Sequence, residues 1–343
     1  MSAAETQNLF QQQEANRRRT RWLVIGFVLF FAWLGFGGDV ILARYTADAA
    51  PGAYRHSGPW IGVLVTLVAA LAAAYAYRTG PEKVLWATGA REVETPQTDS
   101  ERRLVNVVEE MAIAAGVSRP RVWIVPEADP NAFATGRDPQ RSHVAVTEGL
   151  LAKLSRDELQ AVIAHELGHI KSYDTRLMTT LAALVGAVAL ISDGISRSIF
   201  RGGVRVGGGG RGGRGKNAGG LLVVLLVVWL ISWMLAPIIT QLLAMGVSRK
   251  REFLADALSA QFTRNPLALA GALEKIEHAH APTKAIKRGA AHLCIADPLG
   301  RRLDNREGLL ADILATHPPM GKRIARLKGM GYARLKQQGD LPA

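Results

Sequence analysis

Residues 155–174 read SRDELQAVIAHELGHIKSYD, and the rest of the chain is best interpreted outward from this predicted helix. At its centre stands an H-E-x-x-H motif, His165-Glu166-Leu167-Gly168-His169. On an α-helix, residues four apart lie one above the other on the same face, so both imidazoles can bind one metal ion. Glu166 follows the first histidine and can reach a water bound to that metal.

The start of this helix is marked by a capping box. Ser155 is an N-cap residue by type, and Glu158 stands three positions later. An apolar stripe for packing follows at 159, 162 and 163. The alternative is two surface histidines on an ordinary helix. The capped, amphipathic context favours a metal site, and the rest of the chain must then supply a third ligand.

The composition favours a membrane protein. Of 343 residues, 48% are hydrophobic, and the net charge is +13 with a pI of about 10.2. In a soluble protein such a charge indicates nucleic-acid binding. In a membrane protein it more often reflects Lys and Arg residues that flank the membrane spans. Cys294 is the only cysteine, which excludes a disulfide within the chain and a Cys-rich metal site. Histidine and carboxylate must therefore supply the metal ligands.

Four apolar segments predict membrane helices, at residues 22–44, 59–77, 177–192 and 220–247. The third is marginal, because its 16 residues span only roughly 24 Å as a helix. Residues 1–21 form a polar, Arg-rich leader, whose length favours a retained anchor over a cleaved signal peptide. The positive-inside rule keeps this leader cytoplasmic and returns the chain to the cytoplasm after Tyr77. Asp39 is a departure from a clean span.

A Gly- and Arg-rich tract at residues 197–217 separates the third and fourth apolar segments. It contains RGGVRVGGGGRGGRGK at 201–216 and no acidic residue. If the two segments form a hairpin, the tract faces outward, against the positive-inside rule. We favour the hairpin, because both of its ends must return to one catalytic domain. A re-entrant or surface-bound third segment is the alternative.

The remaining segments predict a domain in two halves. Strands are expected at 121–125 and 143–147, and helices at 101–115, 248–262, 267–278 and 322–328. The fold class is therefore mainly α with a small β-sheet and about four transmembrane helices. The expected organisation is the leader at 1–21, two spans at 22–78, half of the domain at 79–175, a membrane hairpin at 176–247 and the second half at 248–343.

The third metal ligand is sought on the helix that follows the hairpin. Residues 251–256 read REFLAD, which places Glu252 and Asp256 four positions apart on one face. A catalytic zinc usually has three protein ligands and one open position, and Glu252 would complete the set. Asp256 would hydrogen-bond a ligand histidine and fix its tautomer. Five other histidines are candidates by type alone: His143, His278, His280, His292 and His317.

The order of these motifs resembles the HtpX-type membrane zinc metalloproteases, which belong to the same gluzincin family as the CAAX prenyl endopeptidases. The matching segments are HELGHI at 165–170, REFLADA at 251–257, PNAFATG at 130–136, VAVTEGLL at 144–151 and THPP at 316–319. The resemblance covers roughly residues 94–329. It implies one Zn²⁺ per chain, with His165, His169 and Glu252 as ligands, Glu166 as general base and Asp256 in support. The Arg-rich leader and the Gly/Arg-rich tract depart from the family pattern.

The resemblance also implies a substrate site and a location. Asn131, Ala132, Phe133 and Ala134 match the family's substrate-facing segment, where an extended peptide can pair with a strand edge. The oxyanion of the reaction needs a donor, for which His317 is the candidate. The expected protein is a multi-pass protease of the inner membrane with a cytoplasmic gluzincin-like domain. Its expected partners are the lipid bilayer and polypeptide substrates, chiefly misfolded membrane proteins in quality control or stress response.

Two other functions compete with proteolysis. A membrane-tethered basic protein could bind nucleic acid through the RGG-like pairs at 201–203 and 211–213, but residues 201–216 contain no interleaved aromatic side chain for base stacking. A non-catalytic adaptor could retain the zinc helix for a structural purpose only. The intact set of candidate metal ligands and general base argues against this alternative. The sequence predicts neither the natural substrate nor the oligomeric state.

Overall fold

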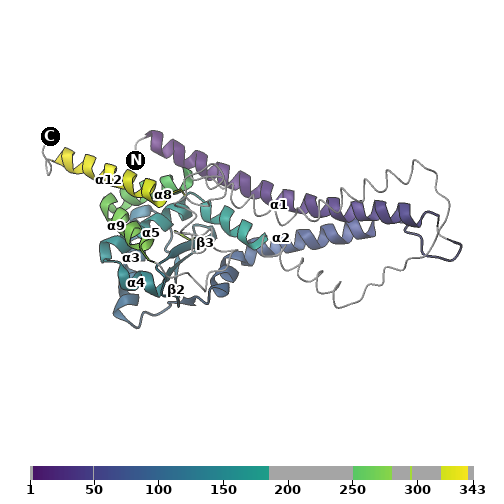
Figure 1. Cartoon of the computed structure of the whole chain (residues 1–343), viewed down its shortest axis with the longest axis horizontal. Helices are drawn as coiled ribbons and strands as arrows, with labels where there is room; N and C mark the ends of the chain where they lie inside the picture. The colour runs from purple at the N-terminus through teal and green to yellow at the C-terminus, as the bar shows by residue number, and fades with distance from the viewer. Residues whose placement is uncertain (1–2, 49, 185–249, 280–293, 296–317, 339–343) are drawn as a thin grey trace. The chain divides into compact units, whose positions relative to one another are not determined.

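The computed structural model describes residues 3–48, 50–184, 250–279, 294–295 and 318–338 (Figure 1). Outside these ranges lie the Gly/Arg-rich tract, the fourth apolar segment and residues 185–192 of the third. His280, His292 and His317 also lie outside them. The chain forms two compact units, the larger from residues 1–20, 77–183 and 243–343 and the smaller from residues 21–76 and 184–242. The described residues are mostly helical, with one small mixed sheet, as the sequence predicts.

Two long helices carry the first two predicted spans. They are α1 (Ala3–Thr46) and α2 (Trp60–Ala87), and both are longer than the apolar runs within them. Among the described residues, these two are long and apolar enough to cross a membrane. In the smaller unit they approach closely at two glycines, since a Cβ on Gly35 would lie 2.8 Å from the Cα of Gly62. Small residues at such a crossing allow two membrane helices to pack backbone to backbone.

Asp39, which interrupts the first apolar run, caps the start of α2. Its carboxylate accepts the backbone N–H groups of Ile61 at 3.1 Å and Gly62 at 2.6 Å. The first N–H groups of a helix have no partner within the helix and favour an anion. The imidazole of His56 lies 2.7 Å from the same carboxylate. The buried Asp39 is therefore a helix cap rather than a flaw in the span.

The larger unit contains a four-stranded sheet in the order β1-β2-β4-β3. The strands are β1 (Arg91–Glu92), β2 (Arg121–Val125), β3 (Ala132–Asp138) and β4 (Arg141–Thr147). Strands β2 and β4 are parallel, from the pair Arg121–His143 to the pair Val125–Thr147, and the other two pairings are antiparallel. Alternate side chains enter two apolar clusters, so both faces of the central strands are buried.

The larger unit also contains six helices among the described residues (Figure 1). They are α3 (Asp99–Ala115), α4 (Glu148–Lys153), α5 (Arg156–Lys171), α8 (Lys250–Thr263), α9 (Pro266–Glu277) and α12 (Met320–Gln338). Of these, α4 and α5 pack against the sheet. The capping box predicted for α5 is present, with Ser155 accepting from the N–H of Glu158. Gly116 ends α3 in the left-handed conformation that glycine adopts most easily. Helix α5 packs against α3, α8, α9 and β3, which places it at the centre of the unit.

Helix α12 is longer than the sequence indicated. The basic helix predicted at 322–328 runs from Met320 to Gln338 and continues through Gly329 and Gly331. The second of them, Gly331, lies against α9, where an added Cβ would meet Leu267 Cδ2 at 2.5 Å. This glycine permits a close helix contact instead of ending the helix.

Candidate metal centre

Three ligand-type side chains from α5 and α8 converge inside the larger unit. His165 and His169 lie on adjacent turns of α5, and Glu252 lies in the first turn of α8. The His165 Nε2–Glu252 Oε2 and His169 Nε2–Glu252 Oε1 distances are both 3.6 Å. One ligand atom from each residue lies within 4.8 Å of the other two, so this group could hold a metal ion.

The outer nitrogen of each imidazole faces its own carboxylate. His165 Nδ1 lies 3.0 Å from Asp256 Oδ1, and His169 Nδ1 lies 3.2 Å from Asp174 Oδ2. An ionised carboxylate only accepts hydrogen bonds, so each ring donates its Nδ1–H and directs Nε2 toward the other ring. The structure thus places Asp256 beside His165, the first of the two proposed ligand histidines.

The distance between the two inner nitrogens fits a shared cation. The Nε2 atoms of His165 and His169 are 3.2 Å apart. Two nitrogens bound at 2.0–2.1 Å to one tetrahedral metal would be about 3.3 Å apart. In neutral rings, two lone pairs so close repel each other unless a cation lies between them. The observed spacing is therefore compatible with two nitrogens that bind one metal ion, and equally with a proton shared between the two rings.

A fully buried arginine supports the carboxylates of the group. Arg323, from α12, donates to Asp256 through Nε at 2.9 Å and Nη2 at 2.7 Å, and its Nη1 lies 3.3 Å from Glu252 Oε2. Burial alone would raise the pKa of Asp256, but the Arg323 guanidinium lowers it to about 2. Asp256 therefore stays ionised, and the two-pronged contact fixes its orientation.

The net charge of the side chains around this group is suited to a divalent cation. Four buried carboxylates belong to Glu166, Asp174, Glu252 and Asp256, and two buried guanidiniums belong to Arg251 and Arg323. With all four carboxylates ionised and both rings neutral, two negative charges are left over, which one divalent ion would balance. Burial alone would lower the pKa of His165, but its hydrogen bonds to Asp256 and Glu252 raise that pKa to about 9. A metal that binds His165 must therefore displace a proton from the imidazole ring.

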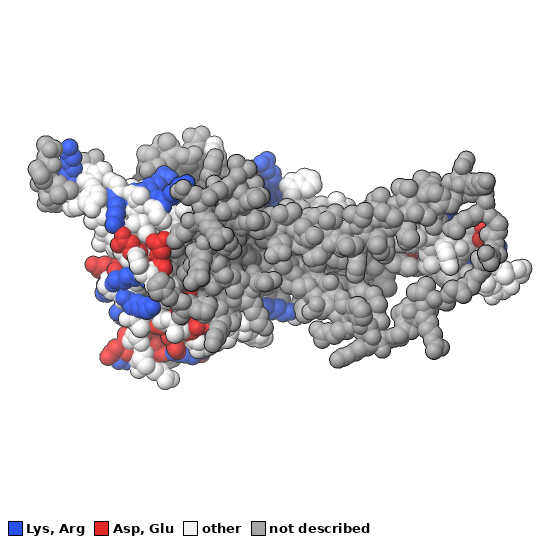
Figure 2. Space-filling view, in the orientation of Figure 1, with Lys and Arg blue, Asp and Glu red and all other residues white. Residues whose placement is uncertain are grey.

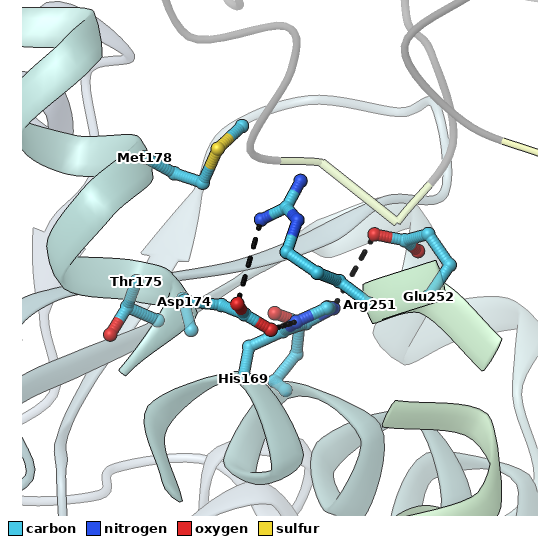
Figure 3. A pocket seen from close by; sticks show the side chains of 8 residues that line it. His169, Asp174, Thr175, Met178, Arg251 and Glu252 are labelled. Carbon is cyan, nitrogen blue, oxygen red and sulfur yellow. Dashed lines mark hydrogen bonds and ion pairs between the residues drawn. The ribbon is translucent and has the colours of Figure 1, made fainter. Parts of the chain in front are cut away.

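Glu166 lies beside this group in a dry environment. It is 1% exposed, and burial raises the pKa of its carboxyl. Glu166 and His169 line a pocket together with Ala134, Arg251 and Glu252 (Figure 3). The close-up also shows Met178 pointing toward the Arg251 guanidinium, whose Nη1 lies 3.9 Å from Asp174 Oδ1.

Of the four residues predicted to face substrate, only Ala134 lines this pocket. Asn131 holds the strands together, since its backbone N–H donates to Thr147 Oγ1 at 2.9 Å and its carbonyl accepts from Thr147 N–H at 3.0 Å. Phe133 is buried in the apolar cluster on the other face of the sheet. The carbonyl of Ala132 accepts the N–H of Ile295 at 2.9 Å, which occupies that part of the β3 edge.

Comparison with known proteins identifies the family. The family model described as Peptidase family M48 matches residues 98–331. The chain belongs to peptidase family M48. A "Protease HtpX homolog" of Dictyoglomus turgidum is 38% identical over 94% of this chain and 95% of its own length. Another "Protease HtpX homolog", of Tropheryma whipplei, is 38% identical over 92% of this chain and 97% of its own length. The crystal structure of S. mikatae Ste24p has a TM-score of 0.45 and 17% identity, and covers 93% of this chain and 66% of that one.

Membership makes this M48 peptidase a metalloprotease, a hydrolase of polypeptides, and its two apolar helices agree with a membrane protease. The resemblance stated from the sequence motifs is thereby confirmed. The other histidines proposed by type alone do not join the group within the described residues: His143 accepts a hydrogen bond from Trp123 Nε1 at 3.1 Å, and His278 is the C-cap of α9.

Two residues of the M48 site were missed by sequence analysis. Asp174 follows His169 by five positions, and its place just past the end of α5 was a usable signal. Arg323 carries no such signal, because it is separated by 158 residues from His165 and by 67 from Asp256. Only the folded chain brings α12 to the metal group.

Proposed function

We propose that this M48 peptidase is a zinc-dependent endopeptidase with one Zn²⁺ per chain, held by His165, His169 and Glu252. The observation that carries the proposal is the convergence of their ligand atoms, with each imidazole already fixed by its own carboxylate. Two imidazoles and one carboxylate are a usual ligand set for a catalytic zinc, which keeps a fourth position open. Asp256 acts through His165 by fixing its tautomer.

Glu166 is the proposed general base. When bound, zinc polarises the scissile carbonyl and lowers the pKa of a coordinated water. Glu166 takes the proton of the attacking water and later delivers it to the leaving amine nitrogen. Its burial supports this role, because a carboxyl whose pKa is raised toward the working pH both accepts and returns a proton efficiently.

His317 remains our proposed donor to the oxyanion. It lies outside the described residues, but only Pro318 and Pro319 separate it from Met320, where α12 begins. The same helix carries Arg323 to Asp256, so the start of α12 belongs to the part of the fold that holds the metal group. A donor here would stabilise the negative charge that develops on the carbonyl oxygen.

The proposed substrate is an extended polypeptide lying along β3. Asn131 to Ala134 remain the proposed substrate segment, and Ala134 is the member that faces the pocket. Because Ile295 occupies the edge at Ala132 and the Gly136 N–H donates to Thr179 Oγ1 at 3.4 Å, backbone pairing with a substrate would centre on Ala134. Pairing through backbone groups suits broad specificity, and misfolded membrane proteins are the substrate class we propose.

We also propose the membrane topology expected from the sequence. Four spans would place residues 79–175 and 248–343 on the cytoplasmic side of the inner membrane, as one catalytic domain interrupted by the hairpin at 176–247. The Arg cluster of the leader supports this orientation by the positive-inside rule. The interleaving of positive and negative side chains on the visible face of the larger unit disfavours the nucleic-acid alternative (Figure 2).

The test compares two variants of the full chain purified in detergent. Glu166→Gln should bind one zinc per chain and lose at least about 10²-fold in the rate of casein cleavage, since it cannot accept the proton. Glu109→Gln, which changes an exposed glutamate on α3, is the matched control and should cleave as the wild type does. Equal cleavage by Glu166→Gln and wild type, or no cleavage by the zinc-loaded wild type, would sink the proposal.

A further inference from the structure

The N-terminal leader lies against the end of the metal-binding helix. Gln13 Nε2 donates to the carbonyl of Lys171 at 2.7 Å, and Asn16 Nδ2 donates to the carbonyl of Ser172 at 2.9 Å. The last carbonyls of an α-helix have no partner within the helix. Two amide side chains of the leader therefore complete the hydrogen bonding at the C-terminal end of α5.

The leader also contacts the turn that follows α5. Tyr173 has a φ of 60°, which is an uncommon backbone conformation for a residue with a side chain. The guanidinium carbon of Arg17 lies 4.2 Å from the centre of the Tyr173 ring, in cation–π geometry. This turn directs the next residue, Asp174, back toward His169, so the leader packs against the residue on which that reversal depends.

Asp174 joins the leader to the metal group. It is 1% exposed, and its Oδ1 accepts a hydrogen bond from Asn16 Nδ2 at 2.6 Å. Its Oδ2 lies 3.2 Å from His169 Nδ1 and accepts from Ser172 Oγ at 2.9 Å. Figure 3 shows this carboxylate between His169 and Arg251. Asp174 thus holds the second ligand histidine as Asp256 holds the first, and it is held in turn by Asn16.

We propose that Asn16 is a positioning residue for the metal centre, acting through Asp174 on His169. The proposal rests on the proposed zinc site. Asn16 is fully buried although it belongs to the polar leader, and one of its amide hydrogens points at the Asp174 carboxylate. A leader that leaves its place would free Asp174 to rotate, and His169 would lose the partner that fixes its ring. Docking of residues 3–20 would then set the metal affinity of the site.

The experiment measures zinc affinity of the full chain in detergent by competition with a chromogenic chelator. Asn16→Leu, which removes the donor and keeps the branched shape of the side chain, should weaken zinc binding about 10-fold, at the lower end of the effects seen for groups that support metal ligands. Asn16→Asp should weaken it further, because two carboxylates would then face each other. Gln11→Ala, an exposed position on the same helix, is the matched control and should bind zinc as the wild type does.

A double variant separates positioning from simple support of the fold. Asn16→Asp combined with Asp174→Asn exchanges donor and acceptor, so it should bind zinc more tightly than Asn16→Asp alone. The visible spectrum of the Co²⁺-loaded protein should change in Asn16→Leu and not in Gln11→Ala. Gln13→Ala, at a partly buried position, provides a further leader variant if substitutions at Asn16 prevent folding, and should weaken zinc binding severalfold.

Wild-type zinc affinity in Asn16→Leu and Asn16→Asp would overturn the proposal, as would wild-type affinity in Gln13→Ala if neither Asn16 variant folds. So would a loss of metal-free thermal stability with no change in zinc affinity, which would mean that the leader only supports the fold. Failure of the wild type to bind zinc would instead refute the proposed function. The two failures are therefore distinguishable.

Discussion

At the scale of single residues, the site depends on buried carboxylates that are held by neighbouring charged or polar side chains. Asp256 is bound by Arg323, and Asp174 is bound by Asn16 and lies near Arg251. An isolated buried charge is costly, whereas one fixed in a complete network can orient a ligand. The imidazoles are consequently positioned by the protein before any metal binds, which lowers the cost of assembling the site.

Away from the metal group, His143 makes stability depend on pH. Burial, reinforced by the nearby charge of Arg121, lowers the pKa of His143 from 6.5 to about 4. Folding therefore favours its neutral form, which accepts the Trp123 N–H. This contribution to the free energy of unfolding is complete above pH 6.5 and is lost as the pH falls from 6.5 to 4. From that pKa difference the loss is at most about 3 kcal/mol.

The variant His143→Gln keeps an acceptor for Trp123 but cannot titrate. Denaturant unfolding is measured at pH 5 and pH 7.5 with a chelator present. Between pH 7.5 and pH 5, the free energy of unfolding should fall less in this variant than in the wild type. The chelator removes metal binding from the comparison. Parallel pH profiles for the two proteins would show that His143 is not the group responsible.

At the scale of secondary-structure elements, the metal group requires α5 and α8 to lie very close together. A Cβ on Gly168 would lie 3.3 Å from Ala255 Cα, and Ser259 Oγ donates to the Ala161 carbonyl at 2.6 Å. The glycine inside the H-E-x-x-H motif thus has a packing role. It allows the helix that carries Glu252 to approach the helix that carries both histidines.

Elements with strong local signals were predicted closely. Strand β2 has the predicted bounds, α3 ends at Ala115 as predicted, and α5 begins directly after the predicted N-cap Ser155. The ligand set of His165, His169 and Glu252 was proposed from helical spacings, which are a local property, and it stays a prediction. The length of α12, the role of Arg323 and the contact of Asp174 with Asn16 were not predicted, since they depend on segments far apart in the chain. Asp174 lies only five positions after His169, and its local signal was overlooked. The predicted hairpin at 176–247 lies almost entirely outside the described residues and stays a prediction.

The turn into α4 gives a stability prediction at this scale. Gly149 leaves no room for a side chain, since a Cβ there would lie 1.9 Å from the Ala128 carbonyl oxygen. Gly149→Ala should lower the free energy of unfolding by about 3 kcal/mol, because backbone must move to remove the clash. Denaturant unfolding in detergent measures the change.

Gly271→Ala, within α9, is the matched control. Its Cβ would meet only the flexible end of Glu158, at 3.3 Å, and alanine favours helix over glycine. It should therefore be neutral or add up to about 1 kcal/mol. If both substitutions cost the same, the close approach at Gly149 does not limit stability.

At the scale of the whole molecule, topology is the main prediction. Cys294 is buried and is the only cysteine, so Cys294→Ala provides a background for single reporters. A membrane-impermeant maleimide should label Ala53→Cys from outside intact cells and Arg119→Cys only after permeabilisation. Both positions are exposed. Gly208→Cys should be labelled from outside if residues 176–247 form a hairpin, and labelling only from the cytoplasmic side would contradict that topology.

The metal centre itself is tested most directly by zinc X-ray absorption on the purified full chain. We predict nitrogen and oxygen ligands at about 2.0–2.1 Å, with scattering from two imidazoles and no sulfur shell. His169→Ala should remove one imidazole or the zinc itself, while His278→Ala, at an exposed histidine, should leave the spectrum unchanged. A sulfur ligand, or a wild-type spectrum in His169→Ala, would contradict a zinc site built from α5 and α8.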